Sequence, residues 1–278
     1  MRRYPARSEG EMDLATLDDT IEPLLMEAGR VALRWFRSGV DVEDKGSAGR
    51  YDPVTAADRA TEAYLRGELL ARFPRTEVVG EEGGRSGTEG GPRWWVDPID
   101  GTRSFVTGQP LWGVLLGLVD GEVPVAGWCR MPYLEETFGA VGGRGWAELR
   151  GHRRPLAAAP TAGLEDASLY ATHPGMFPPG PAGEAFSRLA SRVRLTRFGG
   201  DCYAYCLLAL GHVDLVLDAG LQPYDILPLV PVVEAAGGVV TDWTGAPPLT
   251  GGYVVAAANP ALHAAALAAL APDAEDAP

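Results

Sequence analysis

The sequence predicts an α/β protein with an α+β N-terminal half and an α/β C-terminal half. Apolar residues recur at helical spacing near the N-terminus, short alternating apolar runs follow, and from about residue 160 short strands alternate with helices. The chain of 278 residues is 46% hydrophobic, so it can bury a sizeable core. We expect two packed subdomains, 13–155 and 156–272, with 1–12 and 273–278 as disordered tails.

In the N-terminal half, two helices precede a mainly antiparallel sheet. Apolar side chains at helical spacing predict a helix over 13–36, and a second one over 55–73 can open with a capping box of Thr55 and Asp58. Strands are expected at 76–80 and 93–98, with a flexible acidic loop over 81–91 between them, a hairpin over 111–132 and an edge pair over 136–149.

In the C-terminal half, the alternation of strands and helices predicts βαβ units over a partly parallel sheet. The Pro- and Gly-rich segment 173–184 is expected to be disordered. Strands are expected at 167–172, 194–199, 213–219 and 251–258, and helices at 183–192, 201–211, 225–237 and 260–271.

Composition and charge limit the function classes. A net charge of −13 argues against a nucleic-acid or anionic membrane partner, so small molecules are the expected ligands. The N-terminus has no apolar signal segment, and no apolar run is long enough for a membrane span. Three cysteines without a Cys-x-x-Cys pair favour a cytoplasmic location; Cys202 and Cys206 could share a metal but are better interpreted as buried apolar residues.

The stretch "WWVDPIDGTRSF" places two aspartates, Asp97 and Asp100, directly after an apolar strand. Two ionised carboxylates at this range repel each other, so a shared proton, an arginine or a divalent cation must offset the repulsion. Pro98 and Gly101 could aim both side chains at one point, where Mg²⁺ would find the oxygen ligands it prefers. The same pattern is also an ordinary turn in which aspartates cap backbone amides.

Other carboxylates favour the metal interpretation. Glu81 follows a short apolar strand in the same way, and Asp225 opens an apolar helix, where it could also be a simple cap. If they converge with Asp97 and Asp100, the four carboxylates could hold two or more Mg²⁺ ions, an arrangement suited to phosphoryl chemistry. The N–H groups of "GTRS" could bind phosphate oxygens. No Walker or dinucleotide motif occurs, and no histidine lies in a hydrolase motif.

Four motifs in order resemble the inositol monophosphatase family of Mg²⁺-dependent phosphatases: "DPVTAAD" (52–58), "GEE" (80–82), "DPIDGTRSF" (97–105) and the segment from Tyr224-Asp225 to "EAAGGVVTDWTG" (234–245). The resemblance covers about 260 residues. It implies a layered αβαβα sandwich, two to three Mg²⁺ ions per active site, and homodimers in many members.

The resemblance also implies roles for individual residues. The metal ligands would be Glu81, Asp97, the Ile99 carbonyl, Asp100 and Asp225. Gly101 and Thr102 would contact the phosphate, and Thr102 paired with Asp58 would orient or deprotonate the attacking water, so that Glu81, Thr102 and Asp58 are the expected catalytic residues. Lys45, the only lysine, matches a lysine in a mobile loop near the metals.

The segments 197–205 and 214–225 are similar to the subgroup that acts on histidinol phosphate in histidine biosynthesis. Asp201 and Asp218 would face the alcohol part of the substrate, where two carboxylates suit a cationic amine and an imidazole. Asp201 could instead be an N-cap, and the subgroup usually has glutamate at position 218. Arg197 is the candidate for a basic substrate contact.

The expected activity is therefore hydrolysis of L-histidinol phosphate by in-line attack of a metal-activated water. The alternatives are an inositol-1-monophosphatase, a broad sugar or polyol phosphatase and, more distantly, a non-catalytic scaffold of the same fold.

Overall fold

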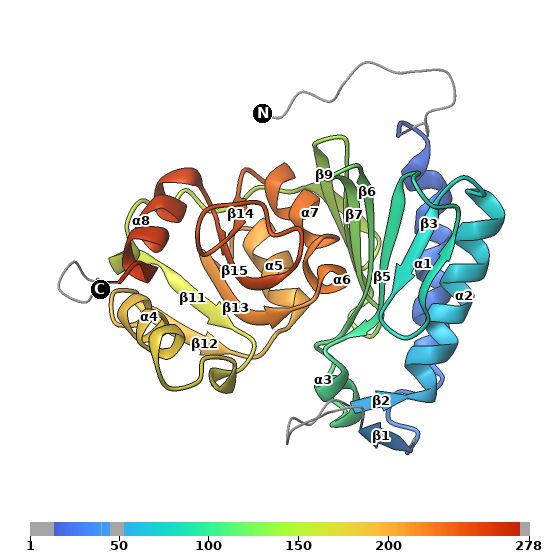
Figure 1. Ribbon diagram of the computed structural model, residues 1–278, viewed down its shortest axis with the longest axis horizontal. Helices are drawn as coiled ribbons and strands as arrows, with labels where there is room; N and C mark the ends of the chain where they lie inside the picture. The colour runs from blue at the N-terminus through green and yellow to red at the C-terminus, as the bar shows by residue number, and fades with distance from the viewer. Residues whose placement is uncertain (1–13, 40, 45–52, 273–278) are drawn as a thin grey trace.

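The computed structural model describes residues 14–39, 41–44 and 53–272, which form helices and strands in five layers (Figure 1). The helices are α1 (Leu17–Leu33), α2 (Ala56–Arg72), α3 (Thr102–Val106), α4 (Pro181–Ala190), α5 (Cys202–Ala209), α6 (Pro223–Ile226), α7 (Leu229–Ala235) and α8 (Pro260–Leu270), with short 3₁₀ helices η1 (Leu164–Asp166) and η2 (Pro174–Met176). In this described part of the chain, no helix is long and apolar enough to cross a membrane.

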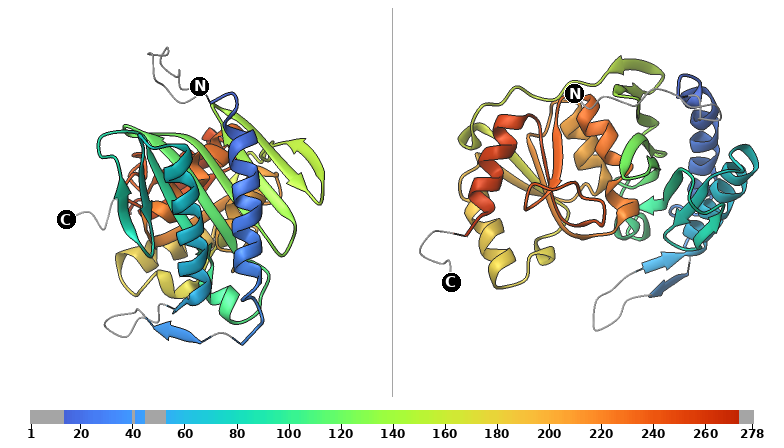
Figure 2. Two further views of the ribbon diagram at one scale, coloured as in Figure 1. Left: turned by 90° about the vertical axis from the view of Figure 1, so that its right-hand side faces the viewer. Right: turned by 45° about the horizontal axis from the view of Figure 1, so that its top comes forward.

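An eight-stranded sheet among the described residues, here called the large sheet, forms the second layer. β5 runs parallel to β3, and all other neighbours are antiparallel. Its strands in spatial order are β10 (His152–Pro155), β9 (Arg144–Leu149), β8 (Glu136–Val141), β7 (Val123–Met131), β6 (Gly113–Asp120), β5 (Arg93–Asp100), β3 (Glu77–Gly80) and β4 (Gly84–Gly87). Figure 2 shows α1 and α2 lying across its outer face.

A five-stranded sheet among the described residues, the small sheet, forms the fourth layer. β11 runs parallel to both β12 and β13, whereas β15 is antiparallel to β13 and β14, so the partly parallel sheet expected from the sequence is confirmed. Its order is β12 (Leu195–Phe198), β11 (Ser168–Ala171), β13 (Leu215–Leu221), β15 (Gly252–Ala257) and β14 (Val239–Asp242). A separate two-stranded ribbon of β1 (Val42–Asp44) and β2 (Pro53–Thr55) completes the described strands.

Apolar clusters fill the spaces between these layers. One lies between α1, α2 and the large sheet, and another packs α5 and α7 between the two sheets. A third packs α4 and α8 on the outer face of the small sheet. The order helix, sheet, helix, sheet, helix confirms the expected αβαβα sandwich (Figure 1). Burial of this apolar surface is the main free energy that holds the layers together.

Glycines in the large sheet let the third layer approach closely. A Cβ atom added to Gly127 of β7 would lie 1.9 Å from the Pro228 carbonyl oxygen, and one on Gly117 of β6 would lie 2.9 Å from the Pro228 Cα. Both distances are too short for a side chain. The backbone between α6 and α7 therefore rests directly on the sheet, which brings the start of α6 next to the end of β5.

Several sequence-based expectations about elements are wrong. The expected loop 81–91 contains β4, and the strands β10 and β14 were not expected. The expected helix 225–237 is two helices, because Pro228 and Pro231 lack the N–H groups that a continuous helix would use. The segment 173–184 is not disordered: it contains η2 and the start of α4, and Phe177 stacks on Phe186 with ring centroids 4.3 Å apart.

The subdomain boundary expected between residues 155 and 156 stays a prediction, and the expected tails lie outside the described residues.

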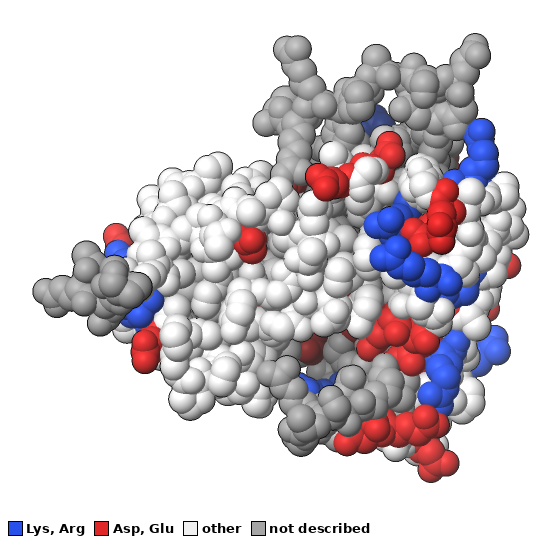
Figure 3. All heavy atoms as spheres, in the orientation of Figure 1, with Lys and Arg blue, Asp and Glu red and all other residues white. Residues whose placement is uncertain are grey.

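On the face shown in Figure 3, acidic and basic side chains gather over the N-terminal half, whereas the half with the small sheet is largely uncharged.

Candidate active site

Carboxylates meet where β5 ends beside the start of α6. One carboxylate oxygen from each of Asp97, Asp100 and Asp225 lies within 4.8 Å of the other two. In a regular strand, residues three apart point to opposite faces. Here the pairing of β5 with β6 shifts between Asp97 and Asp100, and this irregularity lets both side chains point to one side. The predicted convergence of these aspartates is therefore present.

A backbone N–H group orients each of these side chains. Ile99 N donates to Asp97 Oδ1 at 3.0 Å, Cys202 N donates to Asp100 Oδ2 at 2.6 Å, and Gln222 N donates to Asp225 Oδ2 at 2.7 Å. The last bond belongs to a capping box of α6, so Asp225 caps its helix and also faces the other aspartates. The turn-capping and metal interpretations are thus compatible.

The electrostatics of the group are unfavourable as they stand. Burial, and then the charges of Glu81, Asp100 and Asp225, raise the pKa of Asp97 well above its usual range. Burial and the Asp225 charge raise the pKa of Asp100 to about 7, and burial raises the pKa of Asp225 to about 7. The charges that act on Asp97 come from other carboxylates. Because like charges repel, a bound cation would stabilise this group, whereas a bound anion would destabilise it further.

Glu81 lies beside this group. Its backbone N–H donates to the Val96 carbonyl at 3.2 Å, and its charge raises the pKa of both Asp97 and Asp225. Its carboxylate does not belong to the set that meets within 4.8 Å in the described part of the chain. The structure brings Glu81 near the site, and its role as a metal ligand stays a prediction.

Residues 99–102 form the turn that leads from β5 into α3. Gly101 has a φ of +84°, in the left-handed region that glycine adopts readily, and α3 begins directly after it. The Ile99 side chain is fully buried, and its carbonyl accepts a hydrogen bond from Thr102 Oγ1 at 3.0 Å. The geometry places this turn next to the aspartates, as the expected phosphate site requires.

Asp58 is buried at the start of α2. Its Oδ2 accepts hydrogen bonds from Thr55 N at 2.8 Å and from Thr55 Oγ1 at 2.6 Å, which confirms the predicted capping box. Burial raises the pKa of Asp58. Because Thr102 donates to the Ile99 carbonyl and Asp58 accepts from Thr55, the pairing of Thr102 with Asp58 stays a prediction.

Asp201 lies beside this group, at the start of α5, and lines the same small cavity as Asp100 and Asp225. Its φ of +45° is uncommon for a residue other than glycine. In the described structure its carboxylate makes no capping hydrogen bond to α5. Instead Ser104 Oγ donates to Asp201 Oδ2 at 3.1 Å. Burial and the Asp100 charge raise the pKa of Asp201 to about 7. Asp201 therefore occupies the N-cap position of α5, but its side chain does not cap the helix.

Asp218 and Arg197 differ from what we expect of substrate contacts. Asp218 is 1% exposed, and its two oxygens accept hydrogen bonds from Thr172 N at 2.7 Å and Tyr205 Oη at 3.0 Å. Arg197 is exposed on β12, an edge strand of the small sheet. It lines neither of the two cavities beside the carboxylates. Lys45 lies outside the described residues.

Two neighbouring cavities open beside the carboxylates. The smaller, of about 60 Å³, is lined by Asp100, Asp201, Asp218 and Asp225 among others. The larger, of about 620 Å³, also reaches Asp225 and is lined by Arg103 and His173. This is a normal size for a small-molecule site. Sequence analysis missed Arg103 and His173 as lining residues, although Arg103 lies within the "DGTRSF" motif itself.

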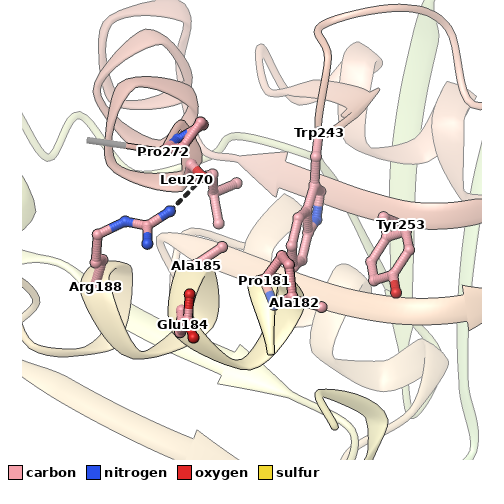
Figure 4. Close-up of a pocket in the computed structure, with 9 residues that line it drawn as sticks. All are labelled: Pro181, Ala182, Glu184, Ala185, Arg188, Trp243, Tyr253, Leu270 and Pro272. Carbon is pink, nitrogen blue, oxygen red and sulfur yellow. Dashed lines mark hydrogen bonds between the residues drawn. The ribbon is translucent and has the colours of Figure 1, made fainter. Parts of the chain in front are cut away.

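A third pocket, of about 410 Å³, lies between α4, the end of α8 and the Trp243 and Tyr253 side chains (Figure 4). In Figure 4, Arg188 points to the end of α8, where its Nη2 donates to the Leu270 carbonyl at 2.9 Å. None of the predicted site residues that the structure describes lines this pocket, although Tyr253 also lines the larger cavity beside the carboxylates.

A five-layered αβαβα fold (Figure 1) in which one buried and two half-buried aspartates meet at the end of a strand places the chain in a class of candidate metal-binding enzymes. The chain belongs to the inositol monophosphatase family, whose sequence model matches residues 13–276, and this confirms the resemblance noted in the sequence.

Individual relatives show the same relationship. The chain is 40% identical to a histidinol-phosphatase of Mycobacterium tuberculosis over 76% of this chain and 82% of that protein. It is 41% identical to the chloroplastic bifunctional phosphatase IMPL2 of Arabidopsis thaliana, over 78% of this chain but only 62% of the plant protein. The solved structure of an inositol monophosphatase from Zymomonas mobilis superposes with a TM-score of 0.80 at 33% identity, covering 92% of this chain and 98% of that one.

Proposed function

We propose that the protein is a Mg²⁺-dependent phosphatase that hydrolyses L-histidinol phosphate to L-histidinol and phosphate. Its membership of a phosphatase family indicates the general reaction, hydrolysis of a phosphoric monoester. The observation that carries the proposal is the meeting of Asp97, Asp100 and Asp225 beside Asp201 and a cavity that can hold a small ester.

The residues present fit Mg²⁺. The ion prefers oxygen ligands, and Asp97, Asp100 and Asp225 offer carboxylate oxygens that are close together. The charges of Asp100 and Asp225 raise the pKa of Asp97, and the Asp225 charge raises the pKa of Asp100. Glu81 and the Ile99 carbonyl would complete the ligand set, for two to three ions. When bound, Mg²⁺ would neutralise the charge of the phosphate and lower the pKa of a water.

The chain's own groups would position the reactants. The turn at Gly101 and Thr102 would direct backbone N–H groups at the phosphate oxygens, which an acidic protein needs because few basic residues line the site. Asp58 and Thr102 would hold the attacking water by hydrogen bonds once Thr102 turns from the Ile99 carbonyl.

The substrate proposal rests mainly on Asp201. Its carboxylate is held by Ser104 within reach of the phosphate turn, and a cationic amine would favour its ionised form. Asp218 is less available, since both its oxygens accept hydrogen bonds from the chain. Relatives named histidinol-phosphatase support this substrate, and the inositol monophosphatase relatives support the alternative, an inositol-1-monophosphatase.

The deciding experiment measures phosphate release from L-histidinol phosphate and from inositol 1-phosphate under the same conditions, with Mg²⁺ and with EDTA. We expect a higher kcat/KM for histidinol phosphate and no turnover in EDTA. Faster turnover of the inositol ester would overturn the substrate and leave the metal-dependent chemistry in place. The homodimer and the cytoplasmic location stay predictions.

A further inference from the structure

A carboxylate on α2 holds the turn that carries Glu81. Glu62 Oε2 accepts a hydrogen bond from Glu82 N at 2.6 Å, and Glu62 Oε1 accepts one from Gly83 N at 2.8 Å. Both donors lie in the turn between β3 and β4, directly after Glu81. Glu62 is only 2% exposed, so these bonds form away from bulk solvent, where hydrogen bonds to a charged group are strong.

Arg66, one helical turn further along α2, balances the Glu62 charge and reaches the same strands. Its Nη2 lies 2.5 Å from Glu62 Oε1 and donates to the Gly84 carbonyl at 2.9 Å. Its Nη1 donates to the Val78 carbonyl at 3.2 Å and to the Ser86 hydroxyl. The pair therefore connects α2 to β3, to β4 and to the turn between them.

The backbone of the turn fits closely around the Glu62 carboxylate. A Cβ atom added to Gly80 would lie 2.3 Å from the Glu62 carboxyl carbon, and one added to Gly83 would lie 2.7 Å from Glu62 Oε1. Neither distance is possible for a real side chain. Two glycines thus let a charged group lie directly against the chain on both sides of Glu81.

We propose that Glu62, balanced by Arg66, is a positioning residue that sets the place of Glu81 and thereby the affinity of the site for Mg²⁺. The inference rests on the proposed function, because it takes Glu81 as a metal ligand. A role in stability alone would not need this arrangement, since a buried ion pair adds little net stability over apolar residues of the same size. The pair instead fixes two N–H groups next to the predicted ligand.

The test replaces Glu62 by glutamine and measures Mg²⁺ binding to the metal-free protein by isothermal titration calorimetry, without substrate. Glu62→Gln keeps the size of the side chain but removes the charge and one of the two acceptor oxygens. We expect its Kd for Mg²⁺ to rise about 10- to 100-fold, the usual effect of removing a partner that orients a metal ligand. At saturating Mg²⁺, kcat should stay close to the wild-type value.

The matched control is Glu68→Gln. Glu68 pairs with Arg72 on the same helix at the same spacing of four residues, but this pair is much more exposed and lies away from the turn. We expect an unchanged Kd. If Glu62→Gln does not fold, Arg66→Lys carries the same test: it keeps the charge but not the fork of hydrogen bonds, and its Kd should also rise.

The outcomes separate the two proposals. If the wild-type protein binds Mg²⁺ and a folded Glu62→Gln binds it equally well, Glu62 is not a positioning residue, while the proposed function is unaffected. A loss of thermal stability with an unchanged Kd would also overturn this inference. If the wild-type protein binds no Mg²⁺, the proposed function fails and the inference fails with it.

Discussion

Two regions of the molecule bury carboxylates in opposite ways. Glu62 is surrounded by donors: Arg66 and two backbone N–H groups neutralise it within the chain. Asp97, in the group at the end of β5, accepts a hydrogen bond from one backbone N–H and otherwise faces carboxylates. Burying a charge without a partner is costly, so the first arrangement suits a structural support and the second suits a site whose partner comes from outside. A buried carboxylate whose charge is balanced within the chain therefore suits a structural role, and one whose charge is not balanced suits a binding role.

Asp218 is an intermediate case. It is as buried as Glu62, but its hydrogen-bond donors, Thr172 N and Tyr205 Oη, are neutral. Burial raises the pKa of Asp218, and these donors lower it. The comparison predicts that Asp218 supports the wall of the cavity more than it binds ligands.

The largest effect should come from the group of aspartates. In Asp97→Asn we expect Mg²⁺-dependent phosphatase activity to fall about 1,000-fold, because a metal ion contributes several kcal/mol of transition-state stabilisation. A phosphate-release assay over a range of Mg²⁺ concentrations measures this. Asp120→Asn, the same change at an exposed hairpin turn, is the control and should keep full activity. Unchanged activity in Asp97→Asn would remove the proposed metal site.

Asp201 should affect substrate choice rather than chemistry. In Asp201→Asn we expect kcat/KM for L-histidinol phosphate to fall about 10- to 100-fold, as for the loss of a hydrogen bond to a charged group. The same parameter for inositol 1-phosphate should change much less, since that ester has no amine. Steady-state kinetics with both esters measure the difference. Equal losses for both would show that Asp201 acts on the site as a whole.

Removal of a donor from Asp218 should reduce stability. Tyr205→Phe leaves the Asp218 Oδ2 without its hydroxyl partner in a fully buried place. We expect a loss of about 1–3 kcal/mol in the free energy of unfolding, from urea denaturation. Tyr253→Phe, at an exposed tyrosine, should change stability little. If Tyr205→Phe were instead as stable as wild type and lost only activity, Asp218 would belong with the ligand-binding carboxylates.

The smallest effect concerns the pH dependence of the metal-free protein. The pKa values of Asp100 and Asp225 are raised to about 7 in the folded state. Between about pH 4 and pH 7 the folded protein therefore binds more protons than the unfolded protein. Stability in EDTA should therefore fall as the pH rises through this window, lowering Tm by at least about 3 °C.

Saturating Mg²⁺ at pH 8 should restore the Tm, because the ion replaces the protons. Asp225→Asn in EDTA should show a smaller fall with pH than the wild-type protein. Scanning calorimetry or dye-monitored melting gives these values. A pH dependence that is the same in Asp225→Asn and wild type would contradict the claim that Asp225 takes up a proton in the folded, metal-free protein.

Much of the fold and the centre of the site could be predicted from the sequence, because local patterns specify them. The capping box of Thr55 and Asp58 depends on residues three apart, and it is present. Asp97 and Asp100 were recognisable because two acidic residues rarely end a buried strand without a partner, and the structure brings them together with Asp225. Four motifs in order also identified the family correctly.

What could not be predicted depends on contacts between distant segments. Glu62 and Arg66 look like an ordinary surface pair on a helix, and only the approach of the turn after β3 shows that they are buried. The one sequence signal for this close approach was the pair of glycines, Gly80 and Gly83, that flank Glu81 and Glu82. β4 was missed because "GRSG" has no apolar alternation and is held by its pairing with β3. The hydrogen bond from Tyr205 Oη to Asp218 also depends on packing between separate elements, so the sequence alone does not reveal it.

The contact between Pro228 and Gly127 has a consequence for how this site can evolve. Asp97 and Asp100 come from the large sheet, whereas Asp225 comes from the helix just before Pro228, so the contact sets the distance between the two sources of proposed metal ligands. A single added methyl group at Gly127 would push the backbone of Pro228 outward and carry Asp225 with it. A misplacement of about 1 Å can cost two orders of magnitude in rate. A mutation at this glycine can therefore abolish the proposed activity, although the glycine is not among the residues proposed to bind metal or substrate.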